Sequence, residues 1–412
     1  MNRTFRRLIF AIALAGLVLP ASARAAERVL NRPHYLVHTD LDPQFADELA
    51  DRLEALYGEY SYRLTMFGKA ADVPRMEVYL FRSQSDYLRF TDGKIRNSGG
   101  LFLPGRNLLA AFLNGQGRQQ LRRTLQHEAF HQFAYNAISP DLPIWLNEGL
   151  AQFFEESLWN GAGLQVGEVP PRRVRQLQSD IRAKRMIPFG TLLSMTDAQW
   201  AKQLSTSREL GSVQYNQSWA MVHFLVMAHN TRKGEDQFLY RDRVIDLLRL
   251  LHSGKPADEA FQIAFGTNIQ AFEQRFTEYA AGLTATPEAT MIENQGVLAD
   301  LLVDFNRQGK RFEDVEAFRQ YVVRGHFKLH YHLGALEWDT NPNMNAYFSD
   351  LDGNRLVSTE LYFAQRPAAA LPDLVCRFSQ QLRLRTRFFE TAARTVDHDV
   401  QIEVSEATAS IR

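Results

Sequence analysis

The sequence has a single cysteine, Cys376, in 412 residues, so it cannot form an intramolecular disulfide. Its stability must therefore come from core packing and from any metal it binds. Acidic and basic residues balance, with 47 of each and a formal net charge of zero. Without a basic run, nucleic acid is not expected as the main partner, because neutralising phosphates requires clustered Lys and Arg. Cys376 itself is expected to be a small buried side chain in a strand rather than a reactive thiol.

The apolar stretch Leu8–Leu19 is too short for a comfortable membrane span. Three arginines precede it, Pro20 ends it, and small-residue cleavage sites follow. This arrangement predicts a signal peptide over residues 1–26. Since no cysteine lies at the cleavage point, a lipid anchor is not expected. We predict an exported protein, periplasmic or secreted, without stable membrane insertion after signal removal.

The stretch Gln126–Phe133, QHEAFHQF, carries the most specific motif. His127 and His131 are four residues apart, so on a helix both imidazoles project from nearly the same face. This spacing lets two neutral ring nitrogens reach one Zn²⁺. Glu128 is the residue type needed to take a proton from zinc-bound water. Apolar residues at helical spacing around the motif favour the helix, and two hydrogen-bonded core histidines are the alternative.

A third ligand is expected from a second helix. Pro143–Glu156 begins with proline at a first helical position and carries Glu148, 17 positions after His131 (148 − 131). A short turn near Pro140 can fold this helix back on the first. Two histidines and a glutamate with an open fourth position form the ligand set of hydrolytic zinc sites. Gln152, one turn after Glu148, is expected to orient a ligand histidine.

The motifs HEAFH and WLNEGLA resemble those of the gluzincin metallopeptidases, in particular an uncharacterised secreted branch of the peptidase-MA-like group. The resemblance is specific over about residues 120–156 and looser over roughly 33–283. It implies His127, His131 and Glu148 as zinc ligands. It also implies Glu128 as the general base.

In gluzincins, a downstream Tyr or His donates to the oxyanion, and Tyr215 lies at a similar distance past the glutamate ligand. A tyrosine at a helix start with its hydroxyl in water is the alternative. Gly99–Leu113 is expected to be a hairpin turned at residues 104–107. The resemblance implies a sheet edge beside the cleft here, able to pair with extended peptide; a plain structural hairpin is the alternative. His223 is expected to be a hydrogen-bonded core residue.

Zinc aminopeptidases of this clan carry a Gly-x-Met-Glu-Asn stretch that grips the substrate's amino end, and Ser98–Asn114 lacks it. Between Leu101 and Leu125 there is no Asp or Glu to pair with a buried substrate ammonium. The segment offers four arginines instead: Arg106, Arg118, Arg122 and Arg123. We therefore predict endopeptidase action, with the strand Leu108–Leu113 as the edge that holds extended substrate.

The rest of the chain divides into segments. Residues 27–118 are expected to form the N-terminal α/β part of the catalytic unit, and 119–283 its helical zinc-binding part. After a linker at Thr284–Thr290, residues 288–412 are expected to form a β-rich domain. The arginine-rich stretch Arg172–Arg185 is expected to be a solvated helix face rather than an anionic site. His326–Leu333 is expected to be a strand with a polar face rather than a second metal site.

Together these features predict an α+β fold with a zincin/gluzincin-like catalytic unit and a C-terminal β-rich domain. The expected function is Zn²⁺-dependent hydrolysis of peptide or protein substrates by a metal-activated water. A catalytically silent, zinc-stabilised binding or scaffold protein is one alternative, although zinc binding alone does not need Glu128. A zinc amidase acting on cell-wall material is the other, and the sequence favours neither substrate.

Overall fold

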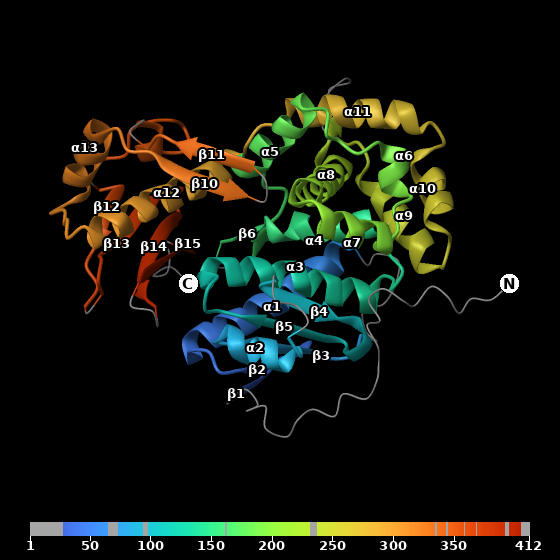
Figure 1. The fold of residues 1–412 in the computed structure, drawn as a ribbon, viewed down its shortest axis with the longest axis horizontal. Coiled ribbons are helices and arrows are strands. Elements are labelled where there is room, and N and C mark those ends of the chain that lie inside the picture. Colours follow the sequence, from blue (N-terminus) through green and yellow to red (C-terminus); the bar gives the residue numbers. More distant parts are fainter. Residues whose placement is uncertain are drawn as a thin grey trace. The chain divides into compact units, whose positions relative to one another are not determined.

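The computed structural model describes residues 28–64, 73–93, 98–160, 163–230, 237–333, 336–342, 345–357, 359–367, 369–391 and 395–404. The predicted signal peptide lies outside these residues. Helices and small sheets are mixed, which confirms the α+β class (Figure 1). Two compact units form: the first holds residues up to Gln116, Gln120–Glu155 and Asp180–Gly282, and the second holds Gly117–Gln119, Glu156–Ser179 and Leu283–Arg412.

The first unit contains a five-stranded sheet in the order β1-β2-β3-β5-β4. Its strands are β1 (Arg28–Asn31), β2 (Tyr35–Thr39), β3 (Met76–Phe81), β4 (Gly100–Leu103) and β5 (Leu108–Phe112). The three central strands are parallel to one another, and β1 and β4 pair antiparallel at the two edges. The sheet therefore has one edge strand, β4, that belongs to the predicted hairpin.

Different helices cover the two faces of this sheet. On one face, Tyr79 of β3 stacks on Phe90 of α2 (Gln84–Phe90), and Phe81 of β3 contacts the same ring at a tilt. On the other face, Tyr35 contacts Tyr57 of α1 (Pro43–Leu64) edge-on. The ring of Tyr57 also contacts a phenylalanine of α3 (Gly117–Ala137). Aromatic packing thus holds α1 and α3 together on one side of the sheet.

The hairpin forms as predicted, but its edge strand is the other arm. The chain turns through the 3-10 helix η2 (Pro104–Arg106) and Asn107, which has a left-handed φ of 50°. β5, the arm predicted as the edge, lies between β3 and β4. All five of its residues are buried and apolar, as a strand paired on both sides requires. β4 is the strand with an unpaired side.

The remainder of the first unit is mostly helical, as expected. Its elements are α4 (Ile144–Glu155), α6 (Phe189–Leu193), α7 (Asp197–Thr206), α8 (Arg208–Met227), β8 (His229–Asn230), β9 (Gln237–Phe238), α9 (Arg241–His252), α10 (Ala257–Phe265) and α11 (Ile269–Gly282). Gly149 lies where α4 meets α8, and a Cβ there would lie 2.6 Å from the carbonyl oxygen of Ser218. Glycine at this position therefore permits the close packing that places α8 beside α4.

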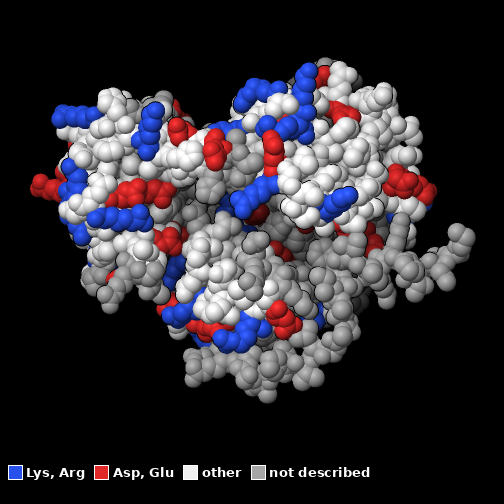
Figure 2. All heavy atoms as spheres, viewed as in Figure 1, with Lys and Arg blue, Asp and Glu red and all other residues white. Residues whose placement is uncertain are grey.

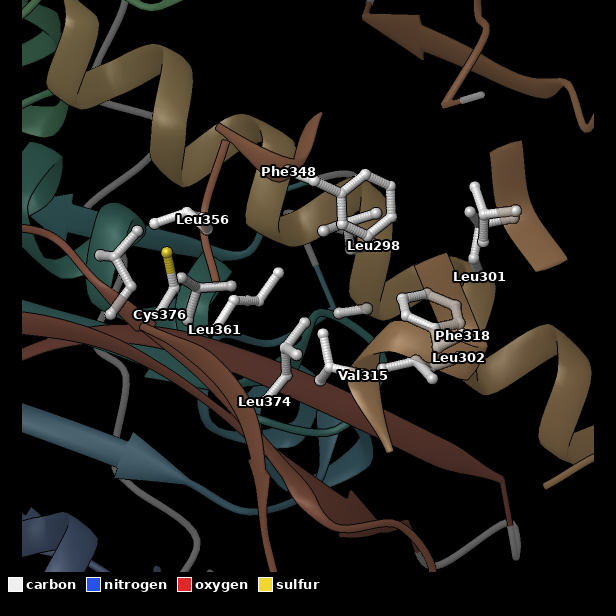
Figure 3. Close-up of a cluster of buried hydrophobic side chains, with 14 of the residues drawn as sticks. Leu298, Leu301, Leu302, Val315, Phe318, Phe348, Leu356, Leu361, Leu374 and Cys376 are labelled. Carbon is white, nitrogen blue, oxygen red and sulfur yellow. The ribbon is translucent and has the colours of Figure 1, made fainter. Parts of the chain in front are cut away.

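The second unit is built on an antiparallel sheet of β12 (Leu361–Ala364), β13 (Asp373–Arg377), β14 (Leu382–Glu390) and β15 (Val396–Val404). Its other elements are β6 (Leu158–Trp159), β7 (Leu164–Gln165), α5 (Pro171–Arg182), α12 (Pro287–Arg307), α13 (Val315–Gly325), β10 (Leu329–Leu333), β11 (Leu336–Thr340) and the 3-10 helix η3 (Asn345–Phe348). Leu298 and Phe318 of the helices pack in one core with Leu374 and Cys376 of β13 (Figure 3). Cys376 is buried in a strand, as predicted, and burial raises the pKa of its thiol to about 12.

Three expectations for these segments differ from the structure. Residues 288–412 open with two helices, and α12 starts inside the expected linker because Pro287 occupies a first helical position. The strand expected from His326 starts at Leu329, since His326 takes a left-handed φ of 50° at the end of α13. Residues 156–179 group with the second unit rather than with the helical part.

Three arginines of α5 are paired within the protein rather than solvated, whereas Arg182 is exposed as predicted. Arg172 and Arg173 both bond to Glu156, whose side chain is only 2% exposed. Arg175 pairs with Glu293 of α12 at 2.5 Å. These partners lie 16 or more positions away along the chain, so the pairing was not visible in the local pattern.

On the face drawn in Figure 2, acidic and basic side chains are interspersed, in keeping with the balanced composition. None of the helices that the structure describes combines the length and the apolar character needed to cross a membrane.

Candidate metal centre

Helix α3 carries the histidine motif and is tied to its neighbours at Gln126. The hydroxyl of Tyr60 on α1 donates to the carbonyl oxygen of Gln126 at 2.8 Å. The side-chain amide of Gln126 donates to the carbonyl oxygen of Phe154 on α4 at 2.9 Å. Because Gln126 precedes His127, these two bonds hold the first histidine in position relative to α1 and α4.

The structure brings His127, His131 and Glu148 together. The two Nε2 atoms are 3.1 Å apart, and Oε2 of Glu148 lies 3.3 Å from Nε2 of His127 and 3.6 Å from Nε2 of His131. Bonds of about 2.0–2.1 Å to a tetrahedral zinc place two ligand atoms about 3.3 Å apart. The three atoms therefore have the spacing of ligands around one ion. In the described part of the chain, this is the group of metal-ligating side chains that comes close enough to hold a metal.

The second ring nitrogen of each histidine has an oxygen partner. Nδ1 of His127 lies 3.2 Å from Oε2 of Glu155, and Nδ1 of His131 lies 3.0 Å from Oδ1 of Asn147. An amide oxygen only accepts, so the proton of His131 is on Nδ1 and its Nε2 keeps a lone pair for a metal. Glu155 also accepts from Arg123 at 2.7 Å. These are the partners that orient metal-binding histidines in zinc sites.

Gln152 does not have the orienting role that its sequence position suggests. Its Oε1 is buried and accepts no hydrogen bond from any residue that the structure describes. One turn after Glu148, Gln152 lies on the same side of α4, but the reach to His127 depends on how α4 crosses α3. Glu155, at the end of α4, is the residue that makes this contact.

The charges of the site are strongly coupled. Burial would lower the pKa of His127, but the hydrogen bonds that its ring donates to Glu148 and Glu155 outweigh burial and raise that pKa well above its usual 6.5. Burial would raise the pKa of Glu148, but His131 and His127 lower it to about 2. Oε2 of Glu148 is also buried without a hydrogen bond of normal geometry among the described residues. A cation between Oε2 and the two neutral imidazoles satisfies this oxygen and replaces the proton, so the residues fit a zinc ion.

Glu128 faces the edge of the sheet. Its Oε2 accepts a hydrogen bond from the backbone N–H of Phe102 in β4 at 2.9 Å. The hairpin is held against α3 at its turn, where Gln132 donates to the carbonyl oxygen of Asn107 at 2.8 Å and Asn136 donates to its Oδ1 at 2.7 Å. The carboxylate expected to act as general base and the edge backbone are therefore adjacent.

A pocket of about 250 Å³ opens beside Glu128 and His127. It is lined by the residues before β4, by α3 and α4, and by Tyr215 of α8. The four arginines expected to line the cleft are not among its described lining residues. Arg122 is instead buried and bonded to Glu48 at 2.6 Å, and Arg123 is bonded to Glu155. The charges of Arg122 and Arg123 are therefore balanced by carboxylates of the protein itself.

Tyr215 lies inside α8 rather than at its start, and its ring contacts Trp200 edge-on at 5.3 Å. Burial, with a smaller contribution from Glu148, raises the pKa of its phenol, so the hydroxyl keeps its proton and can donate. Two turns later, Nδ1 of His223 lies 2.7 Å from the hydroxyl of Tyr279. His223 is 4% exposed and is the hydrogen-bonded core histidine that the sequence predicts.

A family model described as a protein of unknown function, DUF1570, matches residues 122–238. The match includes the three candidate ligands, Glu128 and Tyr215, and it excludes the five-stranded sheet and most of the second unit. No curated protein matches the chain. The family description assigns no activity.

Proposed function

We propose that this protein is an exported zinc-dependent peptidase that hydrolyses peptide bonds in peptide or protein substrates. The convergence of Nε2 of His127, Nε2 of His131 and Oε2 of Glu148 carries the proposal, because their spacing suits one tetrahedral ion. A zinc ion held there would supply Lewis acidity toward a water molecule and the scissile carbonyl. The resemblance of the two helical motifs to gluzincins supports the same assignment.

The roles of the protein side chains follow from their positions. Glu128 follows His127 on α3 and takes the proton of the attacking water, which it later passes to the leaving amine. Tyr215 lines the same pocket with a protonated hydroxyl and donates to the oxyanion. Glu155 and Asn147 hold the imidazoles in the orientation that ligation needs.

The edge strand supports cleavage within a chain. In β4 the N–H of Phe102 points away from β5 and toward Glu128, so an extended substrate can lie along this edge close to the base. Among the described lining residues the carboxylates are Glu128 and Glu155, and Glu155 is already bonded to Arg123 and His127. A free substrate ammonium therefore finds no separate carboxylate there, and we propose endopeptidase action.

Metal content and cleavage of a mixed peptide pool test this function, with wild type beside Glu128→Gln. We expect about one zinc per chain in both proteins, because Glu128 is not a ligand. Hydrolysis should fall by roughly 10²–10⁴-fold in the variant, since glutamine keeps the size of the side chain but is not a base.

Glu278→Gln, an exposed substitution on α11, is the matched control and should cleave like wild type. A wild-type protein that binds zinc but cleaves no peptide would contradict the proposal and favour a zinc-stabilised scaffold.

A further inference from the structure

The pocket beside Glu128 has a polar lining. Beyond the metal centre and Tyr215, it is lined by Ser98, Gly99, Gln120, Thr124, Gln152 and Glu155. No aliphatic side chain is among its described lining residues. An apolar substrate group placed here would cover polar atoms without offering them hydrogen bonds, which is costly.

Most of these polar groups already have partners in the protein. Gln120 donates to Thr124 at 3.5 Å, and Thr124 in turn donates to Gln116 at 3.3 Å. Glu155 is bonded to Arg123 at 2.7 Å. This part of the lining is therefore set before any ligand binds.

Gln152 is the exception. It is 6% exposed, and its Oε1 has no hydrogen-bond partner among the residues that the structure describes. Buried polar atoms are nearly always hydrogen-bonded. Gln152 lines the pocket, so a rotation of its carboxamide toward the pocket would let this acceptor take a donor from a ligand.

We propose that Gln152 is the specificity-determining residue of a substrate subsite for an uncharged, hydrogen-bonding side chain, with the carboxamide of Asn or Gln as the best fit. A carboxamide offers one donor group and one acceptor group, so it can satisfy both ends of the Gln152 side chain. Acidic side chains are disfavoured by Glu128, which lies in the same pocket, and a cationic side chain finds no separate carboxylate because Glu155 is already bonded to Arg123 and His127. This inference rests on the proposed function and names the substrate class of that site.

Short peptide hydroxamates test the inference through binding rather than turnover. Four compounds identical except for the side chain next to the metal-binding group, which is Gln, Leu, Lys or Glu, are titrated calorimetrically into the zinc-loaded protein. The Gln compound should bind about tenfold more tightly than the Leu compound, the value of one well-made hydrogen bond. The Lys and Glu compounds should bind more weakly than the Gln compound.

Gln152→Leu should remove the preference for Gln over Leu while zinc content and melting temperature stay at the wild-type values. Gln262→Leu makes the same substitution at an exposed position of α10 and should keep the wild-type order.

Two failures can be told apart. If none of the hydroxamates binds the zinc-loaded protein, or the protein takes up no zinc, the proposed function fails and the subsite with it. If they bind but the Leu or Lys compound matches the Gln compound, or if Gln152→Leu leaves the order unchanged, the function stands and the role of Gln152 is wrong. A loss of zinc or of melting temperature in Gln152→Leu with unchanged order would show a structural role instead.

Discussion

The two units bury carboxylates in different ways. In the second unit, Glu156 accepts hydrogen bonds from both Arg172 and Arg173, so the protein itself supplies the matching cations. In the first unit, Glu148 faces two imidazoles whose other nitrogens already have oxygen partners in Glu155 and Asn147. Glu156 is neutralised by two arginines of the protein. Glu148 instead faces two imidazole nitrogens that can each give a lone pair to a metal ion.

This contrast distinguishes a structural charge from a chemical one. A buried carboxylate with two guanidinium partners is already neutralised and is not available to bind a ligand. Its removal takes away the negative charge that balances the buried arginines. A carboxylate beside two oriented imidazoles at ligand spacing can coordinate a single metal ion together with them. Burial alone does not separate the two cases, because both carboxylates are largely buried.

The largest effect is expected in the second unit. Glu156→Ala removes the buried carboxylate to which Arg172 and Arg173 are bonded and should lower the free energy of unfolding by about 3–5 kcal/mol, with zinc content unchanged. Denaturation of the zinc-loaded protein by urea measures this. Glu316→Ala, which removes an ion pair with Arg319 on α13, is the control and should cost about 1 kcal/mol or less. Equal losses in the two variants would contradict the difference expected between a buried and an exposed ion pair.

In the first unit the same substitution should act on the metal instead. Glu148→Ala removes one of three ligands and should weaken zinc binding by more than about 100-fold, because loss of an outer-shell partner alone costs 10–100-fold. The stabilisation that zinc gives to wild type should disappear with it. Competition with a chromogenic chelator, together with melting temperatures with and without zinc, checks both. Full zinc occupancy in Glu148→Ala would show that the ligand is misassigned.

The raised pKa of His127 gives zinc binding a pH dependence. Below that pKa the metal-free site holds a proton that zinc must displace, so affinity should weaken about tenfold for each unit of decreasing pH. The metal-free protein should respond with the opposite sign. Protonated His127 stabilises it fully below about pH 6.5, and this contribution is lost as the pH rises through the raised pKa. Chelator competition at several pH values measures the first effect, and a flat profile contradicts it.

The smallest expected effect concerns the substrate's amino end. Peptides with an acetylated N-terminus should be cut about as well as free ones, because the pocket carboxylates are the base itself and Glu155, which is bonded to Arg123. Mass spectrometry of paired peptides measures the two rates. If acetylation abolishes cleavage, a carboxylate outside this pocket reads the free amine.

The sequence predicts the elements that depend on local spacing. The helix of His127 and His131, the helix of Glu148 and the hairpin at residues 104–107 all follow from periodicity and from the placement of proline. The α+β class follows from the same patterns. The predictions that Cys376 is a buried strand residue and that His223 is a hydrogen-bonded core residue are also confirmed. Both residues lie in apolar stretches of sequence.

The predictions that fail are those decided by packing between distant segments. Glu155 rather than Gln152 contacts His127, although the seven-residue spacing of Glu148 and Glu155, two helical turns, is a usable signal. The hairpin pattern does not reveal which arm pairs with β3. The local pattern does not predict the pairing of Arg175, because Glu293 lies 118 positions away.

The hydrogen bond between Phe102 and Glu128 also bears on the solubility of the protein. An unpaired strand edge is a template on which sheets of different molecules join, and natural proteins protect such edges with charge. In β4 the outward N–H of Phe102 is occupied by a carboxylate from a neighbouring helix. In the absence of substrate, the residue assigned to proton transfer therefore also protects this N–H from strand addition, and an extended substrate that pairs here would replace the carboxylate on it.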